Sequence, residues 1–199
     1  MKEKANIRLF ILIGITLFAG LWRLLISAGH TPMSNFTPIG AMALFGGSYF
    51  ISRVRAYLFP LLTLFISDVV LMQTIYAGHS KGLLYDGWYW TYAAFALVVL
   101  IGSVLIKKVS IKNVILGALL AGLTHFLIAN LGVWLRGLTD VTTGLPYTRD
   151  FAGLIKCYTL AIPYFKNMLA GNLIYSAILF GGYELARLRF PVLSRPSAA

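Results

Sequence analysis

Six long apolar segments, separated by polar connections, constrain this chain more than any other feature of its sequence. They cover about residues 8–27, 37–51, 56–74, 88–106, 113–135 and 164–186. A helix needs about 20 apolar residues to cross a hydrocarbon core of about 30 Å, and most of these segments approach that length. Only 12% of the 199 residues are charged, whereas a soluble domain carries about 25%. We therefore predict an all-α integral membrane protein, a single domain (1–199) forming a bundle of six transmembrane helices.

The Lys and Arg residues between the segments predict how the bundle is oriented. One set of connections, together with both ends of the chain, holds eleven of them, the other set holds five, and Arg23 lies within the first segment. Basic loops stay in the cytoplasm. Both termini are therefore predicted to be cytoplasmic, with 187–199 as a basic tail. The same distribution accounts for the net charge of +11 without a nucleic-acid partner. The first segment lacks a good cleavage site, so it is predicted to be a retained helix and not a signal peptide.

The second segment is too short for an ordinary span. From 38 to 51 it offers about 14 helical residues, roughly 21 Å. Thr37 suits an N-cap and Pro38 the first helical position. The helix should therefore begin inside the membrane, where the non-helical chain around Asn35 is tolerated only if it is buried in protein or lines a cavity. The sequence predicts a cavity at this point.

The longest connection, 136–163, contains an amphipathic pattern. Phe151, Leu154, Ile155, Tyr158 and Ile162 recur at helical spacing, and Pro163 follows them. This pattern predicts a separate helix at the outer surface, ended by Pro163 before the sixth span begins. Such a helix can rest on lipid or cover the bundle as a lid.

Polar and aromatic side chains of different segments fall at one level, in the outer half of the bundle. Because polar side chains within spans are costly, they mark function or a structural pair. A mostly apolar pocket with a few placed polar groups is typical of a small-molecule site. The predicted substrate-binding residues are Arg23, Asn35, Asp68, Trp88, Asn130, Trp134, Tyr158 and Asn167.

Structural explanations compete with this hypothesis. Arg23 can extend to the outer headgroups or simply neutralise Asp68. Trp88 can belong to the interfacial aromatic belt. His125 shares a helix face with Gly117 and Gly132, which favours a helix-contact histidine over a ligand.

The motifs of common catalytic centres are missing. The sequence has no phosphate-binding G-x-x-x-x-G-K-[ST] loop, no H-E-x-x-H and no G-x-S-x-G. Its one cysteine, Cys157, can form neither an intrachain disulfide nor an ordinary four-ligand zinc site. We expect no enzyme activity, no metal and no cofactor.

Several stretches resemble an uncharacterised bacterial inner-membrane family whose members are described as candidate transport proteins. They are the run NFTPIGAMALFGG at 35–47, the Ser-Asp pair at 67–68, and 130–134, 153–158, 161–165 and 180–184, within about 34–186. In size and layout that family is similar to the S components of energy-coupling factor vitamin transporters. Where S components carry an Ala-x-x-x-Ala docking stripe on the first helix, this chain has Thr16 and Gly20.

The resemblance implies a multi-pass protein of the bacterial inner membrane that binds a vitamin-like solute from outside. It also implies a transmembrane coupling subunit with two ATPases as partners. Two other functions stay open on the residues alone. One is a structural or assembly protein whose intramembrane polar groups only pair with each other, so that Arg23 and Asp68 touch. The other is a small membrane enzyme acting on a lipid-linked substrate, with His125 or Asp68 at the base of a cleft that opens into the bilayer.

Overall fold

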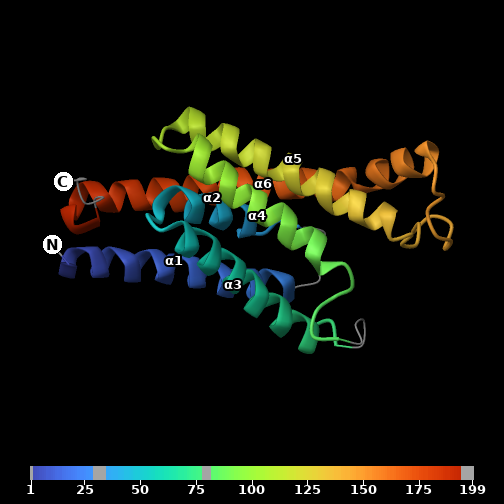
Figure 1. Ribbon diagram of the computed structural model, residues 1–199, viewed down its shortest axis with the longest axis horizontal. Helices are drawn as coiled ribbons and strands as arrows, with labels where there is room; N and C mark the ends of the chain where they lie inside the picture. The colour runs from blue at the N-terminus through green and yellow to red at the C-terminus, as the bar shows by residue number, and fades with distance from the viewer. Residues whose placement is uncertain (1, 29–34, 78–81, 194–199) are drawn as a thin grey trace.

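The computed structural model describes residues 2–28, 35–77 and 82–193, and this part of the chain is all α-helical apart from its connections. The helices are α1 (Lys2–Ala28), α2 (Ile39–Tyr49), α3 (Arg53–Gln73), α4 (Trp88–Leu105), α5 (Ile111–Leu135) and α6 (Phe151–Arg189), followed by a 3-10 turn η1 (Pro191–Leu193). They lie side by side in an elongated bundle (Figure 1). Residues 29–34 and 78–81, and residues 194–199 of the predicted tail, lie outside the described residues.

Four helices are long and apolar enough to cross a membrane: α1, α3, α4 and α5. The protein is therefore a multi-pass membrane protein. Helix α2 has 11 residues, which span about 16 Å, so the prediction of a short second helix is confirmed. It begins at Ile39, one residue later than expected, and Pro38 occupies the N-cap position without a side-chain hydrogen bond. Thr37 is therefore not the cap.

Helix α2 is the centre of the bundle. Each of its residues is buried, and it packs against all five other α-helices. Its small residues face different neighbours: Gly40 lies against Asn172 of α6, and Gly47 against the backbone of Val99 in α4. Because other helices surround α2, its side chains have to be apolar on every face of the helix.

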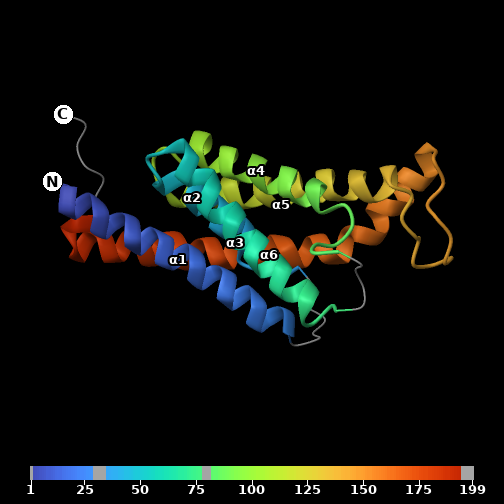
Figure 2. The ribbon, with the colours of Figure 1, turned by 60° about the horizontal axis from the view of Figure 1, so that its bottom comes forward.

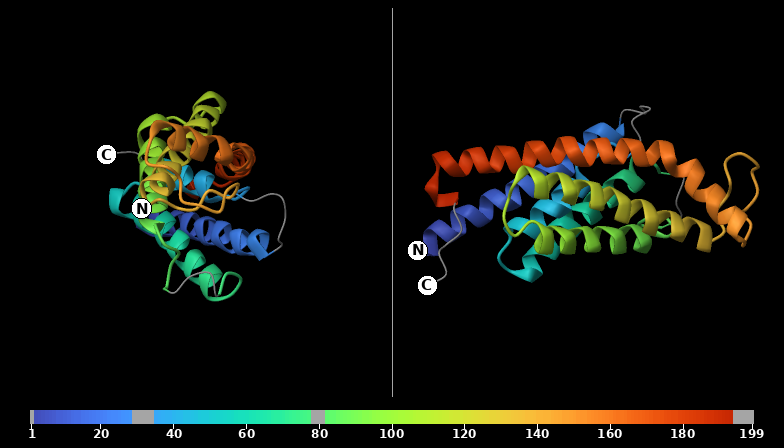
Figure 3. Two further views of the ribbon diagram at one scale, coloured as in Figure 1. Left: turned by 90° about the vertical axis from the view of Figure 1, so that its right-hand side faces the viewer. Right: turned by 90° about the horizontal axis from the view of Figure 1, so that it is seen from above.

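Helix α6 corrects the sequence prediction most clearly. It runs without interruption for 39 residues and contains Pro163 in its interior, so there is no separate outer helix before the sixth span. A proline inside a helix removes one backbone hydrogen bond and adds a clash. Packing against α5 offsets this loss here, and the first part of α6 turns away from the rest (Figure 3).

The predicted apolar stripe on that first part is only partly packed against the bundle. Phe151, Ile155 and Ile162 are exposed, whereas Leu154 and Tyr158 are half-buried and the Tyr158 ring lies 5.3 Å from that of Phe126 on α5, measured between centroids. The most buried side of this part is formed by Gly153 and Cys157. Whether the exposed stripe residues rest on lipid stays a prediction.

The start of α1 and the end of α6 lie at one end of the bundle, together with the turns at 50–52 and 106–110 (Figure 2). We call this the basic end, because Arg53, Arg55, Lys107, Lys108 and Lys112 cluster along these turns and the helix starts that follow them. The opposite end carries the connection 136–150, and we call it the loop end. This arrangement agrees with termini on one side of a membrane; which side is cytoplasmic stays a prediction.

A buried hydrogen-bond network closes the basic end. Arg8 is only 4% exposed and lies within α1, which already begins at Lys2. Its guanidinium donates to the Tyr49 carbonyl at 2.6 Å and to the Tyr183 hydroxyl at 3.3 Å. Tyr49 in turn donates its hydroxyl to Glu184 at 2.5 Å. The network joins α1, α2 and α6.

The close approach of α2 and α4 gives a stability prediction. A Cβ on Gly102 would collide with the backbone of Leu44, which cannot move aside as a flexible side chain would. Gly102→Ala should lower the free energy of unfolding by about 1–3 kcal/mol, the cost of overpacking. Gly181→Ala in α6 is the matched control, because nothing lies within 4 Å of its added Cβ. Thermal unfolding of the two variants in detergent would contradict the packing if both were equally stable.

Candidate functional site

A buried ion pair joins α1 to α3. Arg23 Nη2 lies 2.6 Å from Asp68 Oδ1, and the two side chains are 16% and 2% exposed. Arg23 Nη1 donates to Ser67 Oγ at 2.5 Å, and the Tyr92 hydroxyl of α4 donates to Asp68 Oδ2 at 3.0 Å. Buried charges are tolerated when further hydrogen bonds satisfy them in this way. The ion pair therefore connects three helices.

Aromatic side chains lie on the α4 side of this ion pair. The Trp88 ring meets the Tyr92 ring edge-on, with centroids 5.1 Å apart. In the connection before α4, burial and then the negative charge of Asp68 raise the pKa of Tyr85 to about 12, so its hydroxyl stays protonated at neutral pH. Two predicted site residues, Arg23 and Asp68, thus contact each other, and a third, Trp88, contacts Tyr92, which bonds to Asp68.

A second group of polar side chains lines a cavity of about 140 Å³, which we call the amide cavity. The polar groups come from Asn35 before α2, from His125 and Asn130 on α5, and from Tyr164 on α6. Apolar side chains complete its wall: Phe126, Ala129, Ala161, Phe165 and Met168. Asn35 therefore lies at a cavity, as its position before a short helix predicted.

Local contacts fix the Asn35 end of the amide cavity. Asn35 has a positive φ of 69°, a conformation that Asn adopts more readily than most residues. The next residue, Phe36, places its ring 5.4 Å from that of Tyr175 on α6. At Gly171 the missing side chain lets the backbone of Thr37 approach α6 closely. The chain leading into α2 is thus held against α6.

The donors and acceptors of the amide cavity are neutral. No Lys, Arg, Asp or Glu is among its described lining residues. Asn130 donates its amide nitrogen to the Phe126 carbonyl at 2.7 Å, which leaves the amide oxygen as its acceptor. The His125 ring lies 5.0 Å from the Phe95 ring. The arrangement suits an uncharged molecule that both donates and accepts hydrogen bonds.

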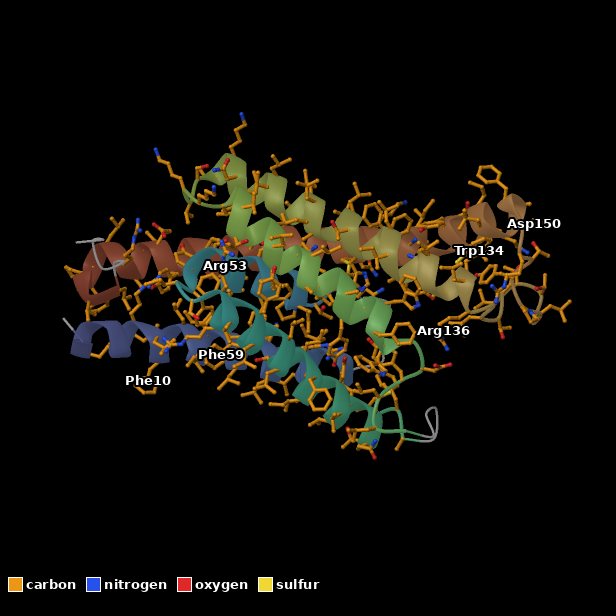
Figure 4. The ribbon with its side chains drawn as sticks, in the orientation of Figure 1. Phe10, Arg53, Phe59, Trp134, Arg136 and Asp150 are labelled. Carbon is orange, nitrogen blue, oxygen red and sulfur yellow. The ribbon has the colours of Figure 1, made fainter. Side chains whose placement is uncertain are left out.

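The remaining predicted residues lie elsewhere. Trp134 donates its indole N–H to the Thr148 carbonyl at 2.9 Å, and Tyr158 donates its hydroxyl to the Leu127 carbonyl at 2.6 Å. Both contacts hold the loop end to the bundle, where Figure 4 labels Trp134, Arg136 and Asp150. Asn167 follows the cavity wall on α6 but is not among the residues lining the amide cavity. The structure thus distributes the eight residues over several places.

Ion pairs order the connection 136–150. Asp140 pairs with Lys156 of α6, and Arg136 pairs with Asp86 before α4. Hydrogen bonds from Lys156 and then from Thr142 lower the pKa of Asp140 to about 2. At the start of α6, Asp150 accepts from the Gly153 N–H at 2.7 Å as the N-cap.

Two residues that line the amide cavity, His125 and Tyr164, are not among the predicted substrate-binding residues. The helix face that His125 shares with Gly117 and Gly132 favours a helix contact, and Asn130 lies about 140° further around α5. At 100° per residue, positions 125, 126, 129 and 130 spread over an arc of about 140°. A cavity that curves around α5 reaches this whole arc. Tyr164 had no such signal, because Pro163 suggested a helix end beside it.

Residues 3–193 match the sequence model of a protein family, described as a family of unknown function (DUF6580). No curated protein and no solved structure matches the chain. Among the described residues, no group of three or more His, Cys, Asp or Glu side chains could hold a metal ion.

The buried ion pair gives a second prediction. Asp68→Leu leaves Arg23 buried without its partner and should lower the free energy of unfolding by about 3–5 kcal/mol. The double variant Arg23→Met/Asp68→Leu should regain most of this loss, since no unpaired charge remains. Asp86→Ala is the control: it removes an ion-pair carboxylate that is 85% exposed and should cost at most about 1 kcal/mol. Unfolding curves in detergent that show no recovery in the double variant would contradict the assignment.

The Asp140 ion pair predicts a pH dependence at the loop end. Because the folded-state pKa of Asp140 lies below the ordinary value of 3.8, its stabilising effect is complete above about pH 4 and is lost as the pH falls through about 2. Hydrogen exchange of the amides of Asp140 and Tyr147, both bonded within the connection, should accelerate over that interval beyond the intrinsic rate. In the Asp140→Asn variant these amides should exchange quickly at every pH, while the Asp86→Asn variant should keep the pH-dependent acceleration. A transition that survives Asp140→Asn belongs to another group.

Proposed function

We propose that this multi-pass membrane protein, which belongs to the family of unknown function DUF6580, captures a small uncharged solute in the amide cavity. The observation that carries the proposal is the meeting of two Asn side chains, a His and a Tyr around one cavity. These groups come from three separate parts of the chain. Small-molecule sites combine an apolar wall with a few polar groups in this manner.

The size of the cavity restricts the solute. A cavity of about 150 Å³ holds one benzene molecule, and the amide cavity measures about 140 Å³. It therefore suits a single ring. The rings of Phe126 and Phe165, whose centroids are 4.5 Å apart, form an aromatic wall against which a planar ring can pack. A neutral heteroaromatic compound with an amide or hydroxyl group combines both requirements, and a vitamin-like micronutrient fits this class.

The similarity in layout to S components supports a role in uptake, with this chain as the solute-binding subunit. Docking would have to differ from theirs, however. Thr16 and Ala19 are buried, and Gly20 lies against Thr63 of α3. The face that corresponds to the docking stripe is thus covered by this chain itself. A coupling subunit with ATPases, if it binds, would use another surface.

A binding experiment tests the proposal. Protein purified in mild detergent is denatured, and released small molecules are identified by mass spectrometry. In parallel, a panel of neutral single-ring compounds, with nicotinamide as the first probe, is screened by thermal unfolding. A ligand at 100 times its Kd should stabilise the fold by about 2.7 kcal/mol.

Paired variants locate the site. Ala161→Leu fills the cavity wall and should abolish both the co-purified ligand and the thermal stabilisation. Ala152→Leu, an exposed position on the same helix, should leave both unchanged. Asn130→Leu should weaken binding by about 10-fold or more, through one lost hydrogen bond and an unsatisfied ligand group. If no small molecule binds, or if Ala161→Leu binds as well as the unaltered protein, the proposal is wrong.

One observation favours a second function. The contact between Arg23 and Asp68, satisfied by Ser67 and Tyr92, is what a structural or assembly protein without a ligand would show. In that case the ion pair serves only to position α1, α3 and α4. The same binding panel separates the two functions, since a purely structural protein stays unaffected by every compound.

A further inference from the structure

The basic end contains a larger cavity that the proposed solute site does not use. It measures about 640 Å³ and lies between the end of α2, the start of α3 and the end of α4. Arg53 and Lys107 line it, together with Tyr57 and Ser103. Its other wall is apolar and includes Phe50, Ile51, Leu100 and Val104. We call it the basic cavity.

The cations of the basic cavity have no partner in the described part of the chain. Neither Arg53 nor Lys107 forms an ion pair there, and no acidic residue lines the cavity. The carboxylates whose side chains the structure describes are engaged elsewhere: Asp68, Asp86, Asp140 and Glu184 in ion pairs, and Asp150 at a helix start. Two positive charges therefore face one cavity, and no described carboxylate balances them.

The start of α3 adds a second unfavourable feature that an anion would relieve. The N-cap Ser52 makes no side-chain hydrogen bond, and the first turn contains no acidic residue. The first turn instead carries Arg53 and Arg55, although the N-terminus of a helix is already positive. Figure 4 shows Arg53 at this turn, at the opposite end from Trp134 and Asp150. An anion beside Arg53 would meet favourable charge from the side chain and from the helix.

The apolar wall identifies what kind of anion fits. From Leu105 at the end of α4 back to Leu100, the helix descends about 7.5 Å from the level of the cations into the apolar part of the bundle. Ile51 and Val104 are 68% and 60% exposed, so this wall opens outward. A ligand that fills the cavity therefore needs a negative group at one end and apolar chains at the other.

We propose that the basic cavity binds the phosphodiester headgroup of an anionic phospholipid, whose acyl chains lie along Leu100 and Val104. Arg53 can hold two phosphate oxygens with its planar guanidinium, and Lys107 supplies a point charge. Basic pockets between membrane helices commonly accept such headgroups. The bound lipid would join the α2–α3 turn to the α4–α5 turn.

Native mass spectrometry of the full-length protein in detergent tests this site. The protein is offered equal amounts of phosphatidylglycerol and phosphatidylcholine with identical acyl chains, and the bound fractions are compared. The unaltered protein should bind one phosphatidylglycerol in preference to phosphatidylcholine. Arg53→Gln/Lys107→Gln should weaken phosphatidylglycerol binding by about 10- to 30-fold, since each cation contributes a several-fold factor.

Matched variants distinguish a site from general surface charge. Arg55→Gln/Lys108→Gln removes the same charge from neighbouring positions outside the basic cavity and should reduce binding by less than about 3-fold, because these cations do not face the headgroup. The charge-preserving variant Arg53→Lys/Lys107→Arg should retain the preference for phosphatidylglycerol over phosphatidylcholine. The single variant Lys107→Gln changes only an exposed turn, so it carries little risk of misfolding. Equal losses in both double Gln variants would overturn the proposal. So would displacement of the lipid by inorganic phosphate at millimolar concentration, because the cavity would then recognise a free anion.

Discussion

The complete burial of α2 is the constraint on which the bundle depends. An 11-residue helix cannot cross a hydrocarbon core, so the chain at its ends has to be enclosed by protein or border a cavity. The other five helices enclose the helix itself, and the exposed Asn35 before it borders the amide cavity. Backbone contacts at Gly47 and Gly102 bring α2 and α4 together more closely than any side chain would allow. The position of Asn35, and with it the amide cavity, follows from where this helix begins.

Polar groups form three separate clusters in the bundle. At the basic end, Arg8 joins α1 to α2 and α6 through Tyr49 and Tyr183. Further along, the Arg23–Asp68 pair joins α1, α3 and α4. The amide cavity lies between α5, α6 and the chain before α2. Arg8 and the Arg23–Asp68 pair form their hydrogen bonds and ion pair with other residues of the bundle. The amide cavity instead combines open space with neutral polar groups. That difference makes the cavity the better candidate for binding a solute.

Some of the candidate site could be predicted from the sequence. Asn35 is predicted from its position before a short helix, and Asn130 because polar side chains in spans are costly; both line one cavity. Arg23 and Asp68 were selected on the same ground and turn out to contact each other. Counting residues along a helix gives the level of a side chain in the membrane. It does not give the neighbour across the bundle, so the sequence predicts one pocket for eight residues that the structure distributes over several places.

The sequence by itself determined the class of protein and the shortness of the second helix, because both follow from the length and apolarity of each segment. It failed at Pro163, where a local rule ended a helix that the structure continues to Arg189. Only the tertiary structure decided this, since the cost of a proline is fixed locally but the packing that offsets it comes from α5. Three further features likewise depend on contacts between distant segments, and no spacing along the chain encodes them. They are the pairing of Arg23 with Asp68, the arc of α5 that reaches the amide cavity and the unbalanced cations of the basic cavity.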